Sequence, residues 1–305
     1  MAKANQQPMS RALARRETIS AYLFLLPSLL FFIVFVVYPM VMCVFTSLTD
    51  ATMADGGGTF IGIANYVNLF KDPIFLKSLV NTAIIVVVSV PIVCIFSLWV
   101  GARIYNMKAW ACSAFRIIFY LPVVTGSVAV TVVWKWIYHY YNGVLNYVGT
   151  GLGLWENKIN WIGDPKFALG CIILILLTTS VGQPIVLYVS ALGNVDQTLV
   201  EAAEVDGATN FQVFWQIKWP QIMPTTLYIL VITTINSFQC FALIQLLTSG
   251  GPNYSTSTVM YYLYETAFRT TKEFGYADAM GVILAIVIAL FSALQFKVMN
   301  GGTTE

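Results

Sequence analysis

Long apolar runs that almost lack charge are the feature that most constrains how this chain folds. Hydrophobic residues make up 58% of the sequence and charged residues only 10%, whereas soluble domains are about half apolar. A helix of about 20 apolar residues crosses the hydrocarbon core of a bilayer. We therefore predict an all-α integral membrane protein with six transmembrane helices. The predicted spans are 21–44, 79–104, 114–136, 168–192, 225–247 and 279–298.

The arginines before the first apolar run bear on both processing and orientation. Arg11, Arg15 and Arg16 precede a run that is too long for a signal-peptide core, and no small-x-small cleavage site follows it, so we predict a retained span. The link between spans two and three carries Arg103, Lys108 and Arg116. Because Lys and Arg concentrate on the cytoplasmic side, we expect both termini there. The tails are then 1–20 and 299–305, the core is 75–298, and 45–78, 137–167 and 248–278 face outward.

The five cysteines and the one histidine do not form a recognisable reactive site. No two cysteines stand at metal-ligand spacing, and most lie inside apolar runs, so we interpret them as small buried hydrophobes. His139 lies in the stretch "YHYYN", where we expect a loop histidine in an aromatic belt. No metal site is expected. No basic patch with interleaved aromatic residues is present, so nucleic acid is not an expected partner.

A polar segment separates the fourth and fifth spans, on the side that we predict to be cytoplasmic. Thr198 and Glu201 have the spacing of a capping box, which predicts a short helix through "EAAEVD". Gly207 then suits the left-handed residue that ends a helix. The segment 193–224 is net acidic, against the positive-inside trend, which suggests that it is kept for another purpose.

A second short helix is predicted to follow directly. Asn210 can cap "FQVFWQIK", and Pro220 and Pro224 are expected to close that helix before the fifth span. Together the two helices form a hairpin at the membrane surface. Three large apolar side chains on a water-facing element favour a partner surface. They are Phe211, Phe214 and Trp215.

The hairpin carries a recognisable motif. Glu201-Ala202-Ala203, Asp206-Gly207-Ala208, Ile217, Pro220 and Pro224 resemble the EAA loop of permease subunits in ABC importers. In that family the loop, here 196–224, is a coupling helix in a cleft of the ATPase. The resemblance implies that Glu201 pairs with a basic residue of the ATPase, that Gly207 permits the bend, and that the alanines allow close approach. The alternative is that Glu201 and Gly207 only cap the helix. The predicted coupling residues are Glu201, Ala202, Ala203, Asp206, Gly207, Ala208, Phe211 and Phe214.

Further stretches resemble the carbohydrate-uptake branch of these permeases, in particular the larger subunit of maltose-type transporters. They are "LIQLLTSGGP" at 243–252, the following "STVMYYLYETAF" and "FGYADAMGVIL", and "NGVLNYVG" with "NWIGDPKFA" between 142 and 168. The first outer segment is too short for the large periplasmic domain of the maltose subunit. The resemblance therefore implies the simpler six-span, type I ABC importer permease fold. It implies import of a sugar, in particular an oligosaccharide, with glycerol phosphate or another small solute as the alternative.

Polar side chains inside two spans are candidates for the substrate path, since such groups rarely face lipid. On the fifth span Thr233, Asn236, Ser237 and Cys240 recur at i, i+3, i+4 and i+7, one face of a helix. The resemblance places six residues at sugar-contacting positions, with Asn236 at a position that is aromatic in the family. The alternative is that these side chains hydrogen bond between helices. The six are Thr179, Ser180, Gln183, Thr233, Ser237 and Cys240.

The scarcity of acidic residues in the spans favours a neutral cargo, because carriers of cations or protons commonly need a carboxylate there. Outside the spans, Val259, Tyr262, Leu263 and Thr266 have helical spacing. We expect this helix either on the outer surface near the binding protein or as an interfacial helix. In the second case the anchors would be Tyr261, Tyr262 and Tyr264.

The chain has no Walker loop of the form G-x-x-x-x-G-K-[ST], so we expect a transport subunit without catalysis of its own. A membrane-embedded enzyme would need paired carboxylates or a metal site, and a secondary carrier would lack a coupling hairpin. The resemblance implies no cofactor on this chain, with ATP and Mg²⁺ on the ATPase. The implied partners are a second homologous permease, an ATP-binding cassette ATPase dimer, an extracytoplasmic sugar-binding protein and the bilayer. The implied location is a bacterial or archaeal cytoplasmic membrane.

Overall fold

The computed structural model describes residues 11–54 and 57–300, and these are almost entirely helices and connecting loops. Of the predicted tails, residues 1–10 and 301–305 lie outside the described part. Within it, the only β-type pairings are two isolated bridges, Thr49 with Phe60 and Thr52 with Glu273. The prediction of an all-α protein is confirmed. The α-helices are α1 (Arg11–Phe32), α2 (Tyr38–Thr46), α3 (Ala64–Leu69), α4 (Pro73–Ile104), α5 (Ala109–Thr125), α6 (Ser127–Ile137), α7 (Val144–Gly151), α8 (Pro165–Ser180), α9 (Gly182–Gly193), α10 (Gln197–Val205), α11 (Asn210–Gln212), α12 (Trp219–Phe238), α13 (Ala242–Leu247), α14 (Val259–Tyr264) and α15 (Phe274–Asn300); the π-helical turns are η1 (Ile33–Val37), η2 (Val213–Lys218) and η3 (Glu265–Arg269).

Five helical segments of the described chain are long and apolar enough to cross a membrane. A sixth crossing results if the bent pair α5 and α6 is taken as one span, which matches the predicted number. The five segments are Thr18–Thr46, Pro73–Ile104, Pro165–Gly193, Asn210–Leu247 and Phe274–Met299.

The predicted third span, 114–136, is wrong as a straight helix. α5 and α6 meet at 98°, with Gly126 between them at φ +82°. Residues other than glycine rarely adopt this left-handed backbone, and no helix continues through it. The bend places α5 against α8 and α6 against α13.

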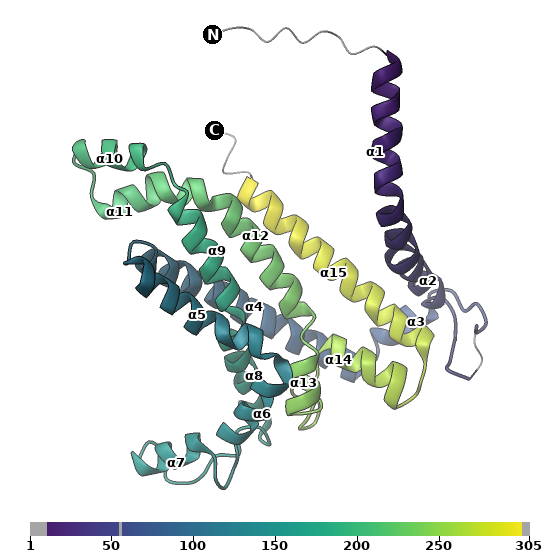
Figure 1. Ribbon diagram of the computed structural model, residues 1–305. Coiled ribbons are helices and arrows are strands. Elements are labelled where there is room, and N and C mark those ends of the chain that lie inside the picture. Colours follow the sequence, from purple (N-terminus) through teal and green to yellow (C-terminus); the bar gives the residue numbers. More distant parts are fainter. Residues whose placement is uncertain (1–10, 55–56, 301–305) are drawn as a thin grey trace.

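Four helices form the packed body of the protein. α4 contacts α9 and α12, and α12 also contacts α15, so these elements lie side by side (Figure 1). They share a core that includes Tyr188, Ile222, Ile229 and Met280, all nearly inaccessible. The first span differs, because none of the residues in its most apolar stretch is buried within the chain. It joins the body where α2 contacts α15.

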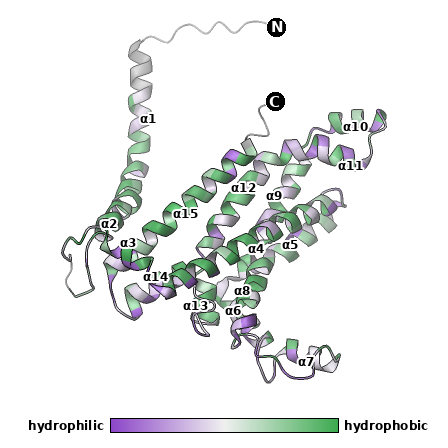
Figure 2. Cartoon of the chain, turned by 180° about the vertical axis from the view of Figure 1, so that it is seen from behind, coloured by the Kyte–Doolittle hydropathy of each residue, from purple (hydrophilic) through white to green (hydrophobic). Residues whose placement is uncertain are grey.

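The two ends of the body differ in composition from its middle. The α10–α11 hairpin, the start of α1 and the end of α15 lie toward one end, and α3, α7 and α14 lie toward the other (Figure 1). Hydrophilic residues gather on α10, α11 and the loops at both ends, whereas the helices between them are mostly hydrophobic (Figure 2). This distribution is that of a protein with a membrane-embedded middle and two wet ends.

The helix predicted at 259–266 forms as α14 and packs partly into the core. Val259 is fully buried and Tyr261 is 1% exposed, because α14 packs against α4 and α15. The Tyr262 hydroxyl donates a 2.7 Å hydrogen bond to Asp72, and the Tyr276 hydroxyl donates one of 3.0 Å to the same carboxylate. The predicted helical spacing is confirmed, and one side of this helix is buried against α4 and α15.

The predictions for cysteine and histidine agree with the structure. Four cysteines are buried and Cys43 is half-buried, all of them free thiols. His139 is exposed in the turn after α6. Its ring centroid lies 6.3 Å from that of Tyr141.

Candidate functional site

The hairpin begins at a different cap from the one predicted. Asp196, and not Thr198, is the N-cap of α10: its carboxylate accepts hydrogen bonds from the Thr198 N–H at 2.9 Å and the Thr198 hydroxyl at 2.7 Å. Thr198 already has helical geometry, so its hydroxyl supports the cap residue and the capping box with Glu201 does not form. The hydrogen bond from the Thr198 hydroxyl has the larger effect on the Asp196 carboxylate, and the one from the Thr198 N–H adds to it. Both lower the pKa of Asp196 below its usual value.

The turn at Gly207 has the predicted form. Gly207 has φ +82° and follows the C-cap Asp206. The Ala208 N–H bonds to the Ala203 carbonyl at 2.9 Å, and the Gly207 N–H bonds to the Glu204 carbonyl at 3.1 Å. This pair of bonds is the Schellman motif, which satisfies the last carbonyls of the helix.

The cap of the second helix lies one residue earlier than predicted. Thr209 is its N-cap, in a capping box with Gln212, and Asn210 is the first helical residue. Pro220 and Pro224 do not close this helix. The helix continues from Asn210 into α12. Before Pro220 the helix widens into the π-helical turn η2, in which the Trp219 N–H bonds to the Phe214 carbonyl. The hairpin is therefore continuous with the fifth span.

The hairpin is anchored in the core and presents a mixed outer face. Val200 and Val213 are 5% and 2% exposed and belong to the same core as α9 and α12. Leu199, Val205 and Phe211 are 51%, 87% and 72% exposed. Of the predicted coupling residues, Ala203, Ala208 and Phe214 pack half-buried against the core. The exposed ones are Glu201, Ala202, Asp206, Gly207 and Phe211.

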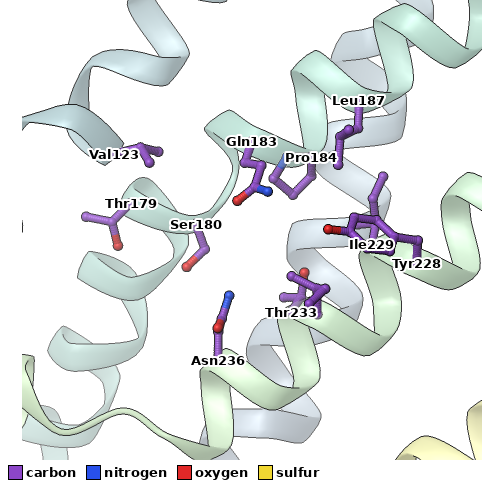
Figure 3. A pocket seen from close by; sticks show the side chains of 11 residues that line it. Val123, Thr179, Ser180, Gln183, Pro184, Leu187, Tyr228, Ile229, Thr233 and Asn236 are labelled. Carbon is purple, nitrogen blue, oxygen red and sulfur yellow. The ribbon is translucent and has the colours of Figure 1, made fainter. Parts of the chain in front are cut away.

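A cavity of about 150 Å³ lies between α8–α9 and α12, with the end of α5 at its side. In Figure 3, Ser180, Gln183 and Asn236 point into it from these helices. The structure thus brings five of the predicted path residues together: Thr179, Ser180, Gln183, Thr233 and Asn236. The rest of the lining is Val123, Pro184, Leu187, Tyr228, Ile229 and Ile232.

The polar groups in this cavity have unused hydrogen-bonding capacity. Within the described chain, the side chains of Ser180, Gln183, Thr233 and Asn236 make no hydrogen bond to the protein. Thr179 differs, since its hydroxyl donates to the carbonyls of two residues in the preceding helical turn. Polar groups that hold helices together would be paired with one another. The unpaired groups are those that a polar cargo could use.

Ser237 and Cys240 lie outside this cavity. Ser237 is buried, with its hydroxyl 3.5 Å from that of Ser89 on α4, and so joins two helices. The predicted helical face ends before Cys240 because α12 stops at Phe238. The Cys240 carbonyl, freed by this break, accepts a 2.9 Å hydrogen bond from the Thr258 hydroxyl.

Two groups of lining residues were missed from the sequence. Tyr228, Ile229 and Ile232 share a helical face with Thr233 and Asn236, so extending that face backwards by one turn would have found them. Val123 carried no such signal. It reaches the cavity because α5 crosses α9 closely at Gly182, where a Cβ atom would clash with the Phe119 carbonyl oxygen.

Fold and site define a helical membrane protein with a polar cavity between two spans and an attached hairpin at one end of them. A family model described as "Binding-protein-dependent transport system inner membrane component" matches residues 57–300, and the chain belongs to this family. The probable ABC transporter permease protein YurN of Bacillus subtilis (strain 168) is 33% identical over 297 residues, 96% of this chain and 100% of YurN. The lactose transport system permease protein LacF of Rhizobium radiobacter is 31% identical over 290 residues, 93% of this chain and 95% of LacF.

A third relative is the multiple sugar-binding transport system permease protein MsmF of Streptococcus mutans serotype c. It is 31% identical over 274 residues, 90% of this chain and 93% of MsmF. The fold is that of a chain in the crystal structure of a bacterial alginate ABC transporter in complex with an alginate pentasaccharide-bound periplasmic protein. The TM-score is 0.80 at 23% identity, covering 95% of this chain and 96% of the other. The predicted ABC importer permease fold is confirmed.

Proposed function

We propose that this chain is the permease subunit of an ATP-driven, binding-protein-dependent importer of a neutral oligosaccharide. The observation that carries the proposal is the group of unpaired hydroxyl and amide side chains between α8–α9 and α12. A sugar passing through a membrane exchanges its hydrogen bonds to water for bonds to such groups. The cavity lies between the two spans that flank the hairpin.

The choice of a neutral sugar has two supports. LacF and MsmF are named for lactose and for multiple sugars, and both cover most of this chain. No charged side chain is among the residues that line the cavity. The structurally similar alginate transporter imports an acidic polysaccharide, for which a basic lining would be expected.

The hairpin is the proposed site of coupling to a separate ATPase dimer, which would bind ATP and Mg²⁺. Glu201, Asp206 and Phe211 present an exposed face that suits a mixed polar and apolar cleft. Since α12 runs into the hairpin without interruption and Val200 is buried in the core, a displacement of the hairpin would tilt the walls of the cavity. A second permease would supply the other half of the path, and a binding protein would deliver the cargo.

The start of α1 and the end of α15 lie toward the same end of the molecule as the hairpin (Figure 1). This common placement supports the proposal that both termini lie in the cytoplasm with the ATPase. Alternating access then requires that ATP binding opens the cavity outward and that hydrolysis returns it inward.

The test is cargo-stimulated ATP hydrolysis by the complete complex in proteoliposomes. Neutral oligosaccharides are expected to stimulate hydrolysis and to accumulate inside, whereas uronic-acid oligosaccharides, glycerol phosphate and amino acids are not. Stimulation by amino acids or metal ions alone would contradict the assignment of a sugar. Stimulation by glycerol phosphate alone would contradict the assignment of a neutral cargo.

A further inference from the structure

A second cavity adjoins the first on the side of the α5–α6 bend. Its volume is about 320 Å³, and it shares Val123 and Thr179 with the first cavity. The bend at Gly126 and the break between α12 and α13 together form its walls. The lining residues that matter for a ligand are Val123, Ser127, Thr131, Thr179, Gln239 and Phe241.

The two cavities adjoin at shared lining residues, and together they offer more room than either does alone. Pockets for small organic ligands usually measure about 300–1,000 Å³. The first cavity, at about 150 Å³, is below this range and the second is near its lower limit. The two together fall within it, because they meet at the shared side chains of Val123 and Thr179.

The second cavity has the chemistry of a sugar site. Gln239 is exposed, and its side chain makes no hydrogen bond within the described chain, nor does the hydroxyl of Ser127. Phe241 offers an apolar ring face, held in place by the ring of Tyr264 at 4.8 Å between centroids. Sites for small molecules typically combine an aromatic surface with a small number of polar groups.

Other polar groups around this cavity are already occupied. The Thr131 hydroxyl donates to the Ser127 carbonyl at 2.6 Å, and the Thr179 hydroxyl donates within its own helix. Gln239 and Ser127 therefore stand out as the polar groups that remain for a ligand. No charged residue is among those that line the second cavity, as in the first.

We propose that the second cavity is a further subsite for a neutral glycosyl unit, so that the path accommodates at least two linked sugar rings. Gln239 binds ring hydroxyls, and Phe241 packs against a ring face. The junction between the subsites lies at Val123 and Thr179. This subsite deepens the proposed function and rests on it, because it assigns a minimum length to the cargo of the same path.

The test is protection of engineered thiols against a charged methanethiosulfonate reagent. Ser180→Cys reports on the first cavity, Gln239→Cys on the second, and Leu246→Cys, exposed on α13 and outside both linings, is the matched control. Each variant is placed in the complete complex, with its binding protein and ATP. The probes are two series of neutral sugars with one, two and three rings. The first is glucose, maltose and maltotriose, and the second is galactose, melibiose and raffinose.

Saccharides of two or three rings that stimulate ATP hydrolysis are expected to slow labelling of both Ser180→Cys and Gln239→Cys about five-fold or more. One-ring sugars are expected to leave Gln239→Cys unprotected, and labelling of Leu246→Cys is expected to stay constant throughout. Protection of Ser180→Cys alone by stimulating saccharides overturns the second subsite and leaves the proposed function intact. Equal protection of Gln239→Cys by one-ring and two-ring sugars also overturns it. If no saccharide stimulates the unaltered complex, the proposed function itself fails.

Discussion

The Lys218 ammonium donates a 2.6 Å hydrogen bond to the hydroxyl of Tyr105. Lys218 ends the π-helical turn of the hairpin, and Tyr105 is the C-cap of α4. The hairpin already connects α9 to α12. The bond therefore joins it to a third helix, α4. Since α4 packs along both of these helices, a displacement of the hairpin is passed to all three together.

Tyr105→Phe removes the acceptor of this bond and keeps the ring. We expect it to lower the free energy of unfolding by about 1.5 kcal/mol, the lower end of the range for hydrogen bonds to charged groups, because this bond is only half-buried. Cargo-stimulated ATP hydrolysis should fall as well. The measurements are thermal unfolding in detergent and ATPase activity in proteoliposomes. Tyr147→Phe, at a residue 80% exposed on α7, is the control, and equal behaviour of the two variants would contradict the link.

Gly207→Ala tests the left-handed turn of the hairpin. Gly207 has φ +82°, and open space surrounds the position where a Cβ atom would stand. The cost is therefore one of backbone conformation alone, about 1 kcal/mol. Gly193→Ala is the matched control, since it also meets open space but lies in the helical region at the end of α9. Thermal unfolding should show a loss for Gly207→Ala only, and equal losses would contradict the assigned turn.

The Asp196 cap predicts a pH dependence of the hairpin. Because its pKa is lowered in the folded state, Asp196 contributes stability above the ordinary carboxyl pKa, about 3.9. That contribution is lost as the pH falls below this value and through the lowered pKa. Hydrogen exchange of the first turn of α10, corrected for intrinsic rates, should speed up over this window. In Asp196→Ala this turn should exchange fast at all pH values. In the control Glu204→Ala the pH-dependent change in exchange rate should remain. If Glu204→Ala lost that change, the effect would belong to Glu204 and not to the Asp196 cap.

Ser180 and Ser237 separate a cargo-binding role from a helix-joining role. Ser180 lines the cavity without a hydrogen bond to the described chain, and Ser237 lies beside Ser89. Ser180→Ala should raise the cargo concentration needed for half-maximal ATPase stimulation several-fold and leave thermal stability unchanged. Ser237→Ala should lower stability by about 0.6 kcal/mol and leave stimulation unchanged. The reverse pattern would exchange the two roles.

Much of the fold follows from sequence patterns that depend on local physics. The spans are evident from apolar runs, because the bilayer sets their length. The turn at Gly207 is evident because few residues other than glycine adopt a left-handed backbone. The sharp bend at Gly126 was not predictable in the same way. Gly101 also interrupts an apolar run, yet it lies within the uninterrupted helix α4, against Tyr188.

The cavity was predictable only in part. Its helix faces come from the 3.6-residue period, which identified Thr233 and Asn236 on α12. Cys240 lies off the predicted helical face because α12 stops at Phe238, and it lines the second cavity instead of the first. The caps of the hairpin were misplaced for another reason. Asp196 and Thr198 are both good cap residues, and the sequence does not decide between them.

Photo-crosslinking from the tip of α10 tests whether the hairpin contacts the ATPase. A benzophenone side chain in place of Val205, which is 87% exposed and one turn beyond Glu201, should form a crosslink to the ATPase subunit in the complete complex. The same side chain in place of Tyr147, 80% exposed toward the opposite end, should form none. If position 205 stays uncrosslinked in every nucleotide state of a complex that still hydrolyses ATP in response to cargo, the hairpin is not the coupling element.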